Sequence, residues 1–365
     1  MFGQAETMPR TQSADFLERI IPEVRSGGAR NIVELAQALH IPVETTRYKV
    51  KGMLKRGLSV HASVDYSKFG LINHEAYFML RPKAQVSEEK FFQNLSEYGF
   101  LTSYARRLPD NGYVCSFALP VGGSLSRLMR GLKEEGLIES PHVQPLSWKV
   151  GHMIHPAYFQ LKRGVWQIDW SKVKKEPVSR EKRGELKLSV EFDSLDLMIA
   201  RALEQEALIK LSDIASSLKT TLNNIFYHFH KHVLGEKLIG GFIIRWNGTP
   251  RQESVFVQFA FEGLDISEEN AAEASVRRLP FLWSDALSLD TGLYIGEAMI
   301  PTSQYLETLR YLSGTLGDSS KKLKVMFLDP KAYHQFPLSA YLFKERGWKF
   351  DPDDCVELVA GKLKK

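Results

Sequence analysis

Hydrophobic and polar residues follow two different periods along this chain, and the two periods succeed one another twice. Residues 15–25, 31–39 and 43–56 each carry apolar side chains at helical spacing, and Pro42 suits the first turn of the third segment. The stretch SVHASVDY that follows alternates like one arm of a short hairpin. Three helices with a tight turn between the second and third, followed by a wing, predict a winged helix-turn-helix.

The chain then changes to the period of strands. Strands are expected at 75–81, 100–108, 113–119 and 137–146, with helices at 87–98 and 124–136. The second half repeats this order, with strands at 254–262, 281–289, 293–300 and 322–328 and helices at 267–278 and 303–316. The order β-α-β-β-α-β predicts a ferredoxin-like domain. The predicted fold class is therefore α+β: two tandem repeats, each a winged helix-turn-helix followed by a ferredoxin-like βαββαβ domain.

Direct comparison of the two halves indicates a duplicated unit of about 180 residues. Leu39 meets Leu218 at an offset of 179, and Trp166 meets Trp348 at 182. The predicted domains are 13–72 (first winged helix-turn-helix), 73–170 (first ferredoxin-like domain with its tail), 171–188 (linker), 189–249 (second winged helix-turn-helix) and 250–365 (second ferredoxin-like domain with its tail). The linker has seven Lys or Arg and few apolar residues, as a solvated tether does. Each tail tryptophan is expected to pack its own tail onto a ferredoxin-like domain.

Composition narrows the class of protein only a little. The 365 residues carry 48 Lys and Arg against 43 Asp and Glu, a mild excess of +5. The two cysteines, Cys115 and Cys355, lie far apart and outside any CxxC, which excludes a disulfide framework or a cysteine zinc site. No apolar run approaches the roughly 18 residues of a membrane helix, so no membrane partner is expected. The N-terminus lacks the apolar core of a signal peptide, and the cytoplasm is the expected location.

The first unit resembles the Lrp/AsnC family of transcription regulators, in a tandem arrangement of an archaeal type. The matching residues follow the family's ELAxxLxxxxxTVxxRVxxLxxxG stretch and the VDxxxLGL stretch after its wing. They are Glu34, Leu35, Ala36, Leu39, Thr45, Lys49, Val50, Met53, Gly57, Val64, Asp65, Phe69, Gly70 and Leu71. The second unit matches mainly in outline.

The resemblance implies a cytoplasmic, sequence-specific regulator that binds double-stranded DNA. Family members pair through their ferredoxin-like sheets, so this fusion resembles such a dimer made within one chain, and a further homodimer through the sheets is an open expectation. The family's Gly-x-x-Asp near the turn between the second and third strands is missing from LPDNGYVCS and SLDTGLYIG. A small-molecule effector at the usual place is therefore not predicted.

The third helix of the first unit holds the predicted DNA contacts. The stretch 47–56 has five Lys or Arg and no acid, as a surface facing phosphates requires. With Thr46, Val50 and Met53 buried, the opposite face would enter the major groove. The candidate DNA-binding residues here are Glu44, Arg47, Tyr48, Lys49, Lys51, Lys55 and Arg56. Arg47 suits a guanine edge, whereas Lys49, Lys51 and Arg56 suit phosphates.

The corresponding helix of the second unit, 221–234, is less basic. Its candidate DNA-binding residues are Thr221, Asn223, Asn224, Tyr227, His228 and His230. Leu222 and Phe226 occupy positions that would face the groove, where exposed apolar groups suit a protein contact better. The two units differ at nearly every such position, so we expect unlike half-sites, or a second unit kept for packing or for a partner.

Other kinds of chemistry find little support in the sequence. His228 and His232 share a helix face while His230 points away, so only two metal ligands align and no metal site is predicted. His152 and His155 have no acidic or cysteine neighbours in sequence and are interpreted as structural. The GG pairs lack phosphate-loop spacing. No cofactor and no catalytic residue is therefore predicted.

Two alternatives stay open: an interaction scaffold with degenerate DNA-binding units, and an enzyme. Siroheme decarboxylases use the same two-domain architecture, so the fold does not exclude chemistry. Those enzymes share an Arg-Arg-x-Gly-Ala stretch in the wing, whereas the wing here reads LSVHASVDY.

Overall fold

The structure is a computed structural model, and the residues that it describes cover most of the chain. They are 16, 19, 20, 23, 32–54, 58–81, 86–152, 158–160, 165–175, 191–245, 251–288, 290–345 and 347–362. The helix expected at 15–25 and most of the expected linker fall largely outside them. The described part is a mixed α+β fold built around a large antiparallel sheet, as the sequence predicted.

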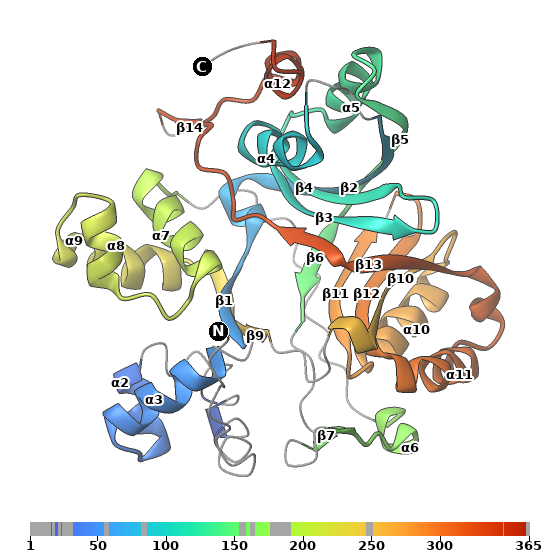
Figure 1. Ribbon diagram of the computed structural model, residues 1–365, viewed down its shortest axis with the longest axis horizontal. Helices are drawn as coiled ribbons and strands as arrows, with labels where there is room; N and C mark the ends of the chain where they lie inside the picture. Colours follow the sequence, from blue (N-terminus) through green and yellow to red (C-terminus); the bar gives the residue numbers. More distant parts are fainter. Residues whose placement is uncertain are drawn as a thin grey trace, which may run out of the picture.

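Two helical regions, here called the first and second heads, lie beside each other on one side of the sheet (Figure 1). The described elements of the first head are α2 (Ile32–Leu39), α3 (Val43–Leu54) and β1 (Ser59–Val64). The second head consists of α7 (Ser194–Gln205), α8 (Leu211–Ser217), α9 (Leu222–His228) and β9 (Ile239–Arg245). Thr46, Val50 and Met53 are buried in α3 as expected. The helix expected at 221–234 is α-helical only to His228 and continues as a π-helix over Phe229–Leu234.

The strands β1 and β9 join the two heads. They pair antiparallel in a two-stranded sheet, with Ser59 opposite Arg245 and His61 opposite Ile243. The sequence predicted a hairpin within the first head. Instead, β1 of the first head pairs with β9 of the second head. Each strand thereby satisfies the backbone hydrogen-bonding groups along the edge of the other.

The strands and helices of each half follow the expected order closely. The first half has β2 (Leu71–Leu80), α4 (Glu88–Tyr98), β3 (Leu101–Leu108), β4 (Tyr113–Pro120), α5 (Leu125–Glu134) and β5 (Ile138–Pro145). The second has β10 (Ser254–Phe261), α10 (Ile266–Arg277), β11 (Leu282–Ser288), β12 (Leu293–Pro301), α11 (Tyr305–Leu316) and β13 (Leu323–Gln335). Short 3-10 helices lie at Tyr66–Phe69, Arg251–Glu253, Thr302–Gln304 and Gly317–Lys322. Side chains of Ser87, Ser124 and Asp265 cap the N-termini of α4, α5 and α10.

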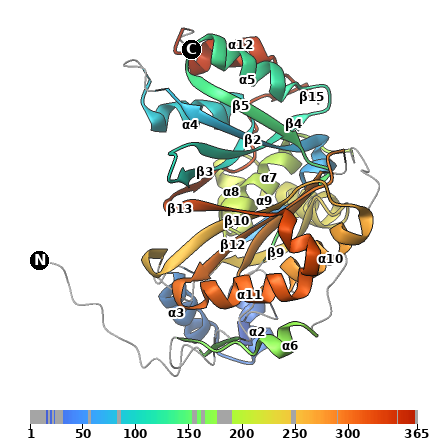
Figure 2. The ribbon, with the colours of Figure 1, turned by 90° about the vertical axis from the view of Figure 1, so that its right-hand side faces the viewer.

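The halves share one nine-stranded sheet in the order β5-β2-β4-β3-β13-β10-β12-β11-β6, where β6 is Trp148–Gly151. The strands at the two ends of this order, β5 and β6, follow one another in the chain. Between them Leu146 N–H donates to Asn73 of β2 and Ser147 N–H donates to Leu287 of β11. The sheet therefore curls until its ends meet. Figure 2 shows the result: helices α4, α5 and α12 above, two facing halves of the sheet, and α10 and α11 below.

Alternation along the strands separates two outer cores from an interior between the facing halves. Ala76 and Phe78 of β2 join the core under α4 and α5, and Phe259 of β10 joins the core against α10 and α11. Residues of the opposite parity point inward. The interior includes apolar residues such as Phe256 and Met299, but also the polar side chains of Glu75, Gln258 and Glu297. A polar group buried between two sheets needs partners there: Gln258 donates to Oε1 of Glu75 and Ser284 donates to Glu297, whereas Oε2 of Glu75 has no partner among the described residues.

The segments after each half cross over to the other half. The first contains β7 (Phe159–Gln160), β8 (Val165–Trp166) and α6 (Trp170–Val173); the second contains β14 (Phe343–Lys344), β15 (Gly347–Trp348) and α12 (Pro352–Val359). Trp166 lies 4.7 Å from Phe281 between ring centroids, whereas Trp348 donates its Nε1–H to Phe69 at 2.7 Å. Each tail thus packs on the other half, a choice of partner that the sequence did not predict.

Among the described residues, no helix is both long and apolar enough to cross a membrane.

Candidate functional site

A large hollow of the described structure lies where the paired strands β1 and β9 meet the mouth of the curled sheet. This cavity has a volume of about 1150 Å³. Its wall is formed by β1 and β9, the end of α7, β6, the end of α10 and the ends of β11, β12 and β13. Both halves of the chain contribute, so the cavity exists only because the two units are folded together.

One wall of the cavity combines a cation with aromatic rings. The guanidinium of Arg245, the last residue of β9, lies 4.1 Å from the centroid of the Trp283 ring. Its Nε and Nη1 are buried and have no hydrogen-bond partner among the described residues. Trp283 donates its Nε1–H to the hydroxyl of Tyr333 at 3.1 Å. A buried guanidinium with unused donors is costly unless a ligand supplies acceptors, and a carboxylate matches it best.

A histidine held by a buried carboxylate lies on another wall. His152 Nε2 is 2.8 Å from Oδ1 of Asp285, which is fully buried on β11. Asp285 also accepts from Arg277 Nε at 2.6 Å and from the Tyr294 hydroxyl at 2.8 Å. Burial alone would raise the pKa of Asp285, but the hydrogen bonds and positive charges of His152 and Arg277 hold that pKa below its usual value. The carboxylate thus stays ionised and orients the imidazole toward the cavity that His152 lines.

The cavity floor reaches the polar interior of the sheet. Lys149 Nζ lies 3.6 Å from Glu297 Oε2 and donates to Ser116 Oγ at 2.8 Å. Glu75 is fully buried nearby, where Gln258 donates to its Oε1 at 3.1 Å. Burial raises the pKa of Glu75 to about 7, against the opposing charge of Lys149. The positive charge of Lys149 offsets part of the free-energy cost of burying the carboxyl groups of Glu75 and Glu297.

Glu204, at the end of α7, connects the second head to the first wing. Its carboxylate accepts from the Tyr66 hydroxyl at 2.5 Å and from the Leu338 N–H at 2.8 Å. His61 Nδ1 lies 2.8 Å from the backbone oxygen of the same residue. Burial raises the pKa of Glu204 to about 7 despite the hydrogen bonds from Tyr66 and Leu338. Burial lowers the pKa of His61, because it disfavours the charged imidazolium.

The raised pKa of Glu204 predicts a pH dependence of stability. The folded protein binds the Glu204 proton more tightly than an ordinary glutamate with pKa 4.5. Its stabilising contribution is therefore complete below about pH 4.5 and is lost as the pH rises through about 7. At about 1.4 kcal/mol per pKa unit, the loss amounts to at most about 3.5 kcal/mol.

Glu204→Gln should flatten this dependence, since a neutral amide keeps an acceptor but has no proton to lose. Urea unfolding at about pH 5 and about pH 8 measures it. Glu206→Gln, at an exposed site two residues away, is the matched control and should change neither value. An equal pH dependence in Glu204→Gln and the wild type would contradict the assignment.

The structure places part of the candidate DNA contacts of the first head, Glu44, Tyr48 and Lys51, at exposed positions of α3. Tyr48 is 62% exposed, and Lys51 is exposed beside it. Arg47 forms an ion pair with Glu44 within α3, and Lys49 Nζ lies 5.2 Å from the centroid of the Phe16 ring. Lys55 and Arg56 lie outside the described residues. Arg47 is thus engaged with its own helix.

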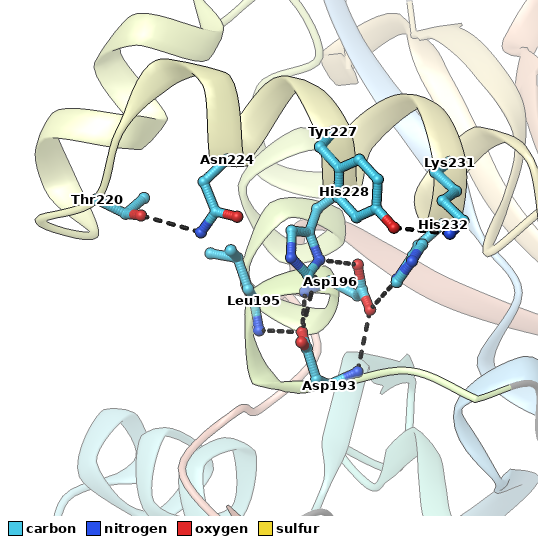
Figure 3. A network of polar contacts seen from close by, with 9 residues as sticks. All are labelled: Asp193, Leu195, Asp196, Thr220, Asn224, Tyr227, His228, Lys231 and His232. Atoms are coloured by element: carbon cyan, nitrogen blue, oxygen red, sulfur yellow. Dashed lines mark hydrogen bonds and ion pairs between the residues drawn. The ribbon is translucent and has the colours of Figure 1, made fainter.

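In the second head the candidate residues separate. Thr221 caps α9 by accepting from the Asn224 N–H, Asn223 and His230 are exposed, and Tyr227 is 49% exposed. Leu222 and Phe226 are exposed too, as expected for that face. His228 instead turns inward, where its Nδ1 lies 2.8 Å from Asp196 of α7 (Figure 3). None of the candidate residues that the structure describes in either head lines the cavity.

The comparisons with known proteins concern the fold. No protein-family model matches the chain, and no curated protein matches it significantly. Two solved structures match 96% of this chain at 10% sequence identity and a TM-score of 0.55. One is the siroheme decarboxylase NirDL, of which 99% is covered. The other is the same enzyme in complex with an iron-uroporphyrin III analogue, of which 100% is covered. This similarity is consistent with the Lrp/AsnC-like fold that the sequence resemblance implies.

The comparisons correct the predicted function. A DNA-binding regulator that is not an enzyme was expected, with a decarboxylase as the less favoured alternative. That expectation was wrong: the solved structures that share the fold along nearly the whole chain are of an enzyme, and no comparison supports DNA binding. The physical reason is that one architecture carries both activities, so the fold of the heads does not distinguish them.

Proposed function

We propose that this chain is a decarboxylase whose substrate is an iron tetrapyrrole with carboxylate side chains, bound in the cavity between the wings and the sheet. We interpret its architecture as two tandem repeats, each a winged helix-turn-helix followed by a ferredoxin-like domain. The observation that carries the proposal is a cavity of about 1150 Å³ walled by the guanidinium of Arg245, whose Nε and Nη1 have no hydrogen-bond partner among the described residues. The fold shared with siroheme decarboxylase NirDL supports it.

The size and the lining of the cavity both favour this substrate class. Pockets for ordinary small ligands span about 300–1,000 Å³, so this one suits a larger molecule. Trp283 and Tyr333 offer aromatic surface to a flat macrocycle, and Arg245 beside them offers donors to its carboxylates. The basic pair expected in the first wing of such enzymes is missing, but Arg245 supplies a cation from the second wing, directly opposite Ser59.

The reaction needs one proton and no oxidant. The C–C bond between a side-chain methylene and its carboxylate breaks and CO2 leaves. The electron pair stays on the methylene carbon, which the conjugated ring stabilises, and a proton converts that carbon to a methyl group. His152 is the proton donor in this scheme, because Asp285 fixes its Nε2 and the ring lies on the cavity wall. Burial in the cavity excludes water from the departing carboxylate.

Arg245→Gln tests the binding half of the proposal. Because the guanidinium would donate to a substrate carboxylate, its loss should raise the Kd for iron-uroporphyrin III by about 10- to 100-fold. Titration of the full chain, followed by the visible absorption of the macrocycle, measures this Kd. Arg310→Gln, at an exposed site on α11, is the control and should bind as the wild type does.

Conversion of siroheme tests the whole proposal. Anaerobic incubation with the wild-type chain should give products that have lost CO2, detected by mass spectrometry. A wild type that neither binds iron-uroporphyrin III nor releases CO2 from siroheme refutes the proposal; binding without conversion leaves a tetrapyrrole-binding protein and refutes the decarboxylase.

A further inference from the structure

A second group of polar side chains gathers in the second head, away from the cavity. Asp196 of α7 faces His228 at the end of α9 and His232 in the π-helix that follows (Figure 3). Its Oδ1 lies 2.8 Å from Nδ1 of His228, and its Oδ2 lies 3.0 Å from Nδ1 of His232. The three facing atoms all lie within 4.8 Å of one another.

The carboxylate at the centre is held in place before any ligand arrives. Asp196 is fully buried, and the Asp193 N–H donates to its Oδ2 at 3.0 Å as one half of a capping box. The reciprocal bond runs from the Asp196 N–H to Oδ1 of Asp193. The cap that starts α7 therefore also fixes the direction of the Asp196 side chain, as the outer shell of a metal site does.

The helix geometry changes where the two histidines lie. After His228 the helix widens from α to π over Phe229–Leu234. Single π turns inside α-helices are rare and frequently occur at functional sites. His228 and His232 keep their side chains only 12% and 26% exposed, whereas His230 between them is exposed and stacks near Phe226. His228 and His232 thus face Asp196 from the junction of the α and π segments, whereas His230 does not.

The duplicated unit provides an internal comparison. At the offset of 179 that relates the two heads, Asp196, His228 and His232 correspond to Leu17, Lys49 and Met53. Met53 is buried in the first head. The second head has the metal-ligating residue types Asp and His at these three positions, whereas the first head has neither type at any of them. Packing alone does not require this set.

We propose that Asp196, His228 and His232 bind a divalent transition-metal ion of the Zn²⁺ type. Two imidazole nitrogens and one carboxylate oxygen form the kind of three-ligand set that leaves one position open. Asp193, whose Oδ1 is 3.8 Å from His228 Nδ1, lies beside that position. The ion joins α7 to the third helix and so stabilises the second head. Without it, each histidine donates its Nδ1–H to Asp196, and binding moves that proton to the other ring nitrogen or into solution.

Metal titration of the full chain tests this site independently of any enzymatic activity. Protein freed of metal with a chelator is titrated with Zn²⁺ against a chromophoric competitor, and Co²⁺ replaces Zn²⁺ to report the ligand set by its visible spectrum. We expect one tight equivalent of Zn²⁺ and a rise in Tm on binding.

Matched variants on one helix distinguish this site from other histidines. His228→Gln and His232→Gln should each weaken Zn²⁺ binding by at least about 100-fold, since even loss of an outer-shell partner costs about 10- to 100-fold. His230→Gln should bind as the wild type does. Circular dichroism checks that the variants fold, and Asp196→Asn, which also breaks the cap, is used only if it passes this check.

Two results would overturn the proposal: no tight equivalent of Zn²⁺ or Co²⁺ in the wild type, or tight binding that His228→Gln and His232→Gln leave unchanged. In either case the cluster is a hydrogen-bonded join between the two helices.

Discussion

His152→Gln is expected to lower kcat for siroheme decarboxylation by about 10²- to 10⁴-fold, the range that a positioned general acid contributes. The carbanion left by CO2 needs a proton at once, and glutamine has none to give. Oδ1 of Asp285 lies 2.8 Å from Nε2 of His152, and the Asp285 carboxylate is itself held by hydrogen bonds from Arg277 and Tyr294. The donor is thus oriented before the substrate binds.

Binding and pH dependence separate this role from a merely structural one. The Kd of His152→Gln for iron-uroporphyrin III should stay within a few-fold of the wild type, because Arg245 carries the carboxylate contact. The limb of the pH–rate profile that reports the acid should disappear. His142→Gln, on β5 and outside the cavity lining, is the matched histidine control and should retain full activity. A raised KM with an unchanged kcat would assign His152 to binding instead.

The fold was largely predictable because each element carries its own local signal. The pattern of apolar residues predicted a helix at 124–136, and the structure has α5 at Leu125–Glu134. The strands matched to within a few residues at most ends for the same reason. The pairing of β1 with β9 and the exchange of tails were missed, because both place contacts between units, and a period within one unit has no information on its partners.

The site was not predictable from spacing. His152 was interpreted as structural since no acid lies near it in sequence, yet Asp285 meets it from 133 positions further along the chain. Asp196 reaches His228 in the same way across 32 positions. The sequence therefore showed two metal ligands, whereas the folded head has three facing groups. Arg245 carried one usable signal, a lone cation at the end of an otherwise apolar strand.

Lys149→Met is expected to lower the free energy of unfolding by about 3–5 kcal/mol, as removal of one partner from a buried ionic group does. Lys149 is 20% exposed, and its Glu297 partner is 8% exposed at the foot of the cavity. Without the Lys149 cation, the carboxylates of Glu297 and the fully buried Glu75 repel each other, because both charges have the same sign. The pKa of Glu75, which burial already raises to about 7, then rises further, so the loss should be larger at about pH 8 than at about pH 5.

A second change in the same group should recover most of that loss. Lys149→Met combined with Glu297→Gln removes both charges of the pair, and replacing a buried pair as a whole is often neutral. Lys324→Met, which breaks an exposed pair with Glu262, should cost at most about 1 kcal/mol. Urea unfolding of the four proteins at both pH values gives the comparison. If Lys149→Met lowers the free energy of unfolding no more than Lys324→Met does, the buried carboxyl groups do not need the Lys149 cation. The role of Lys149 then lies in the cavity and not in the stability of the fold.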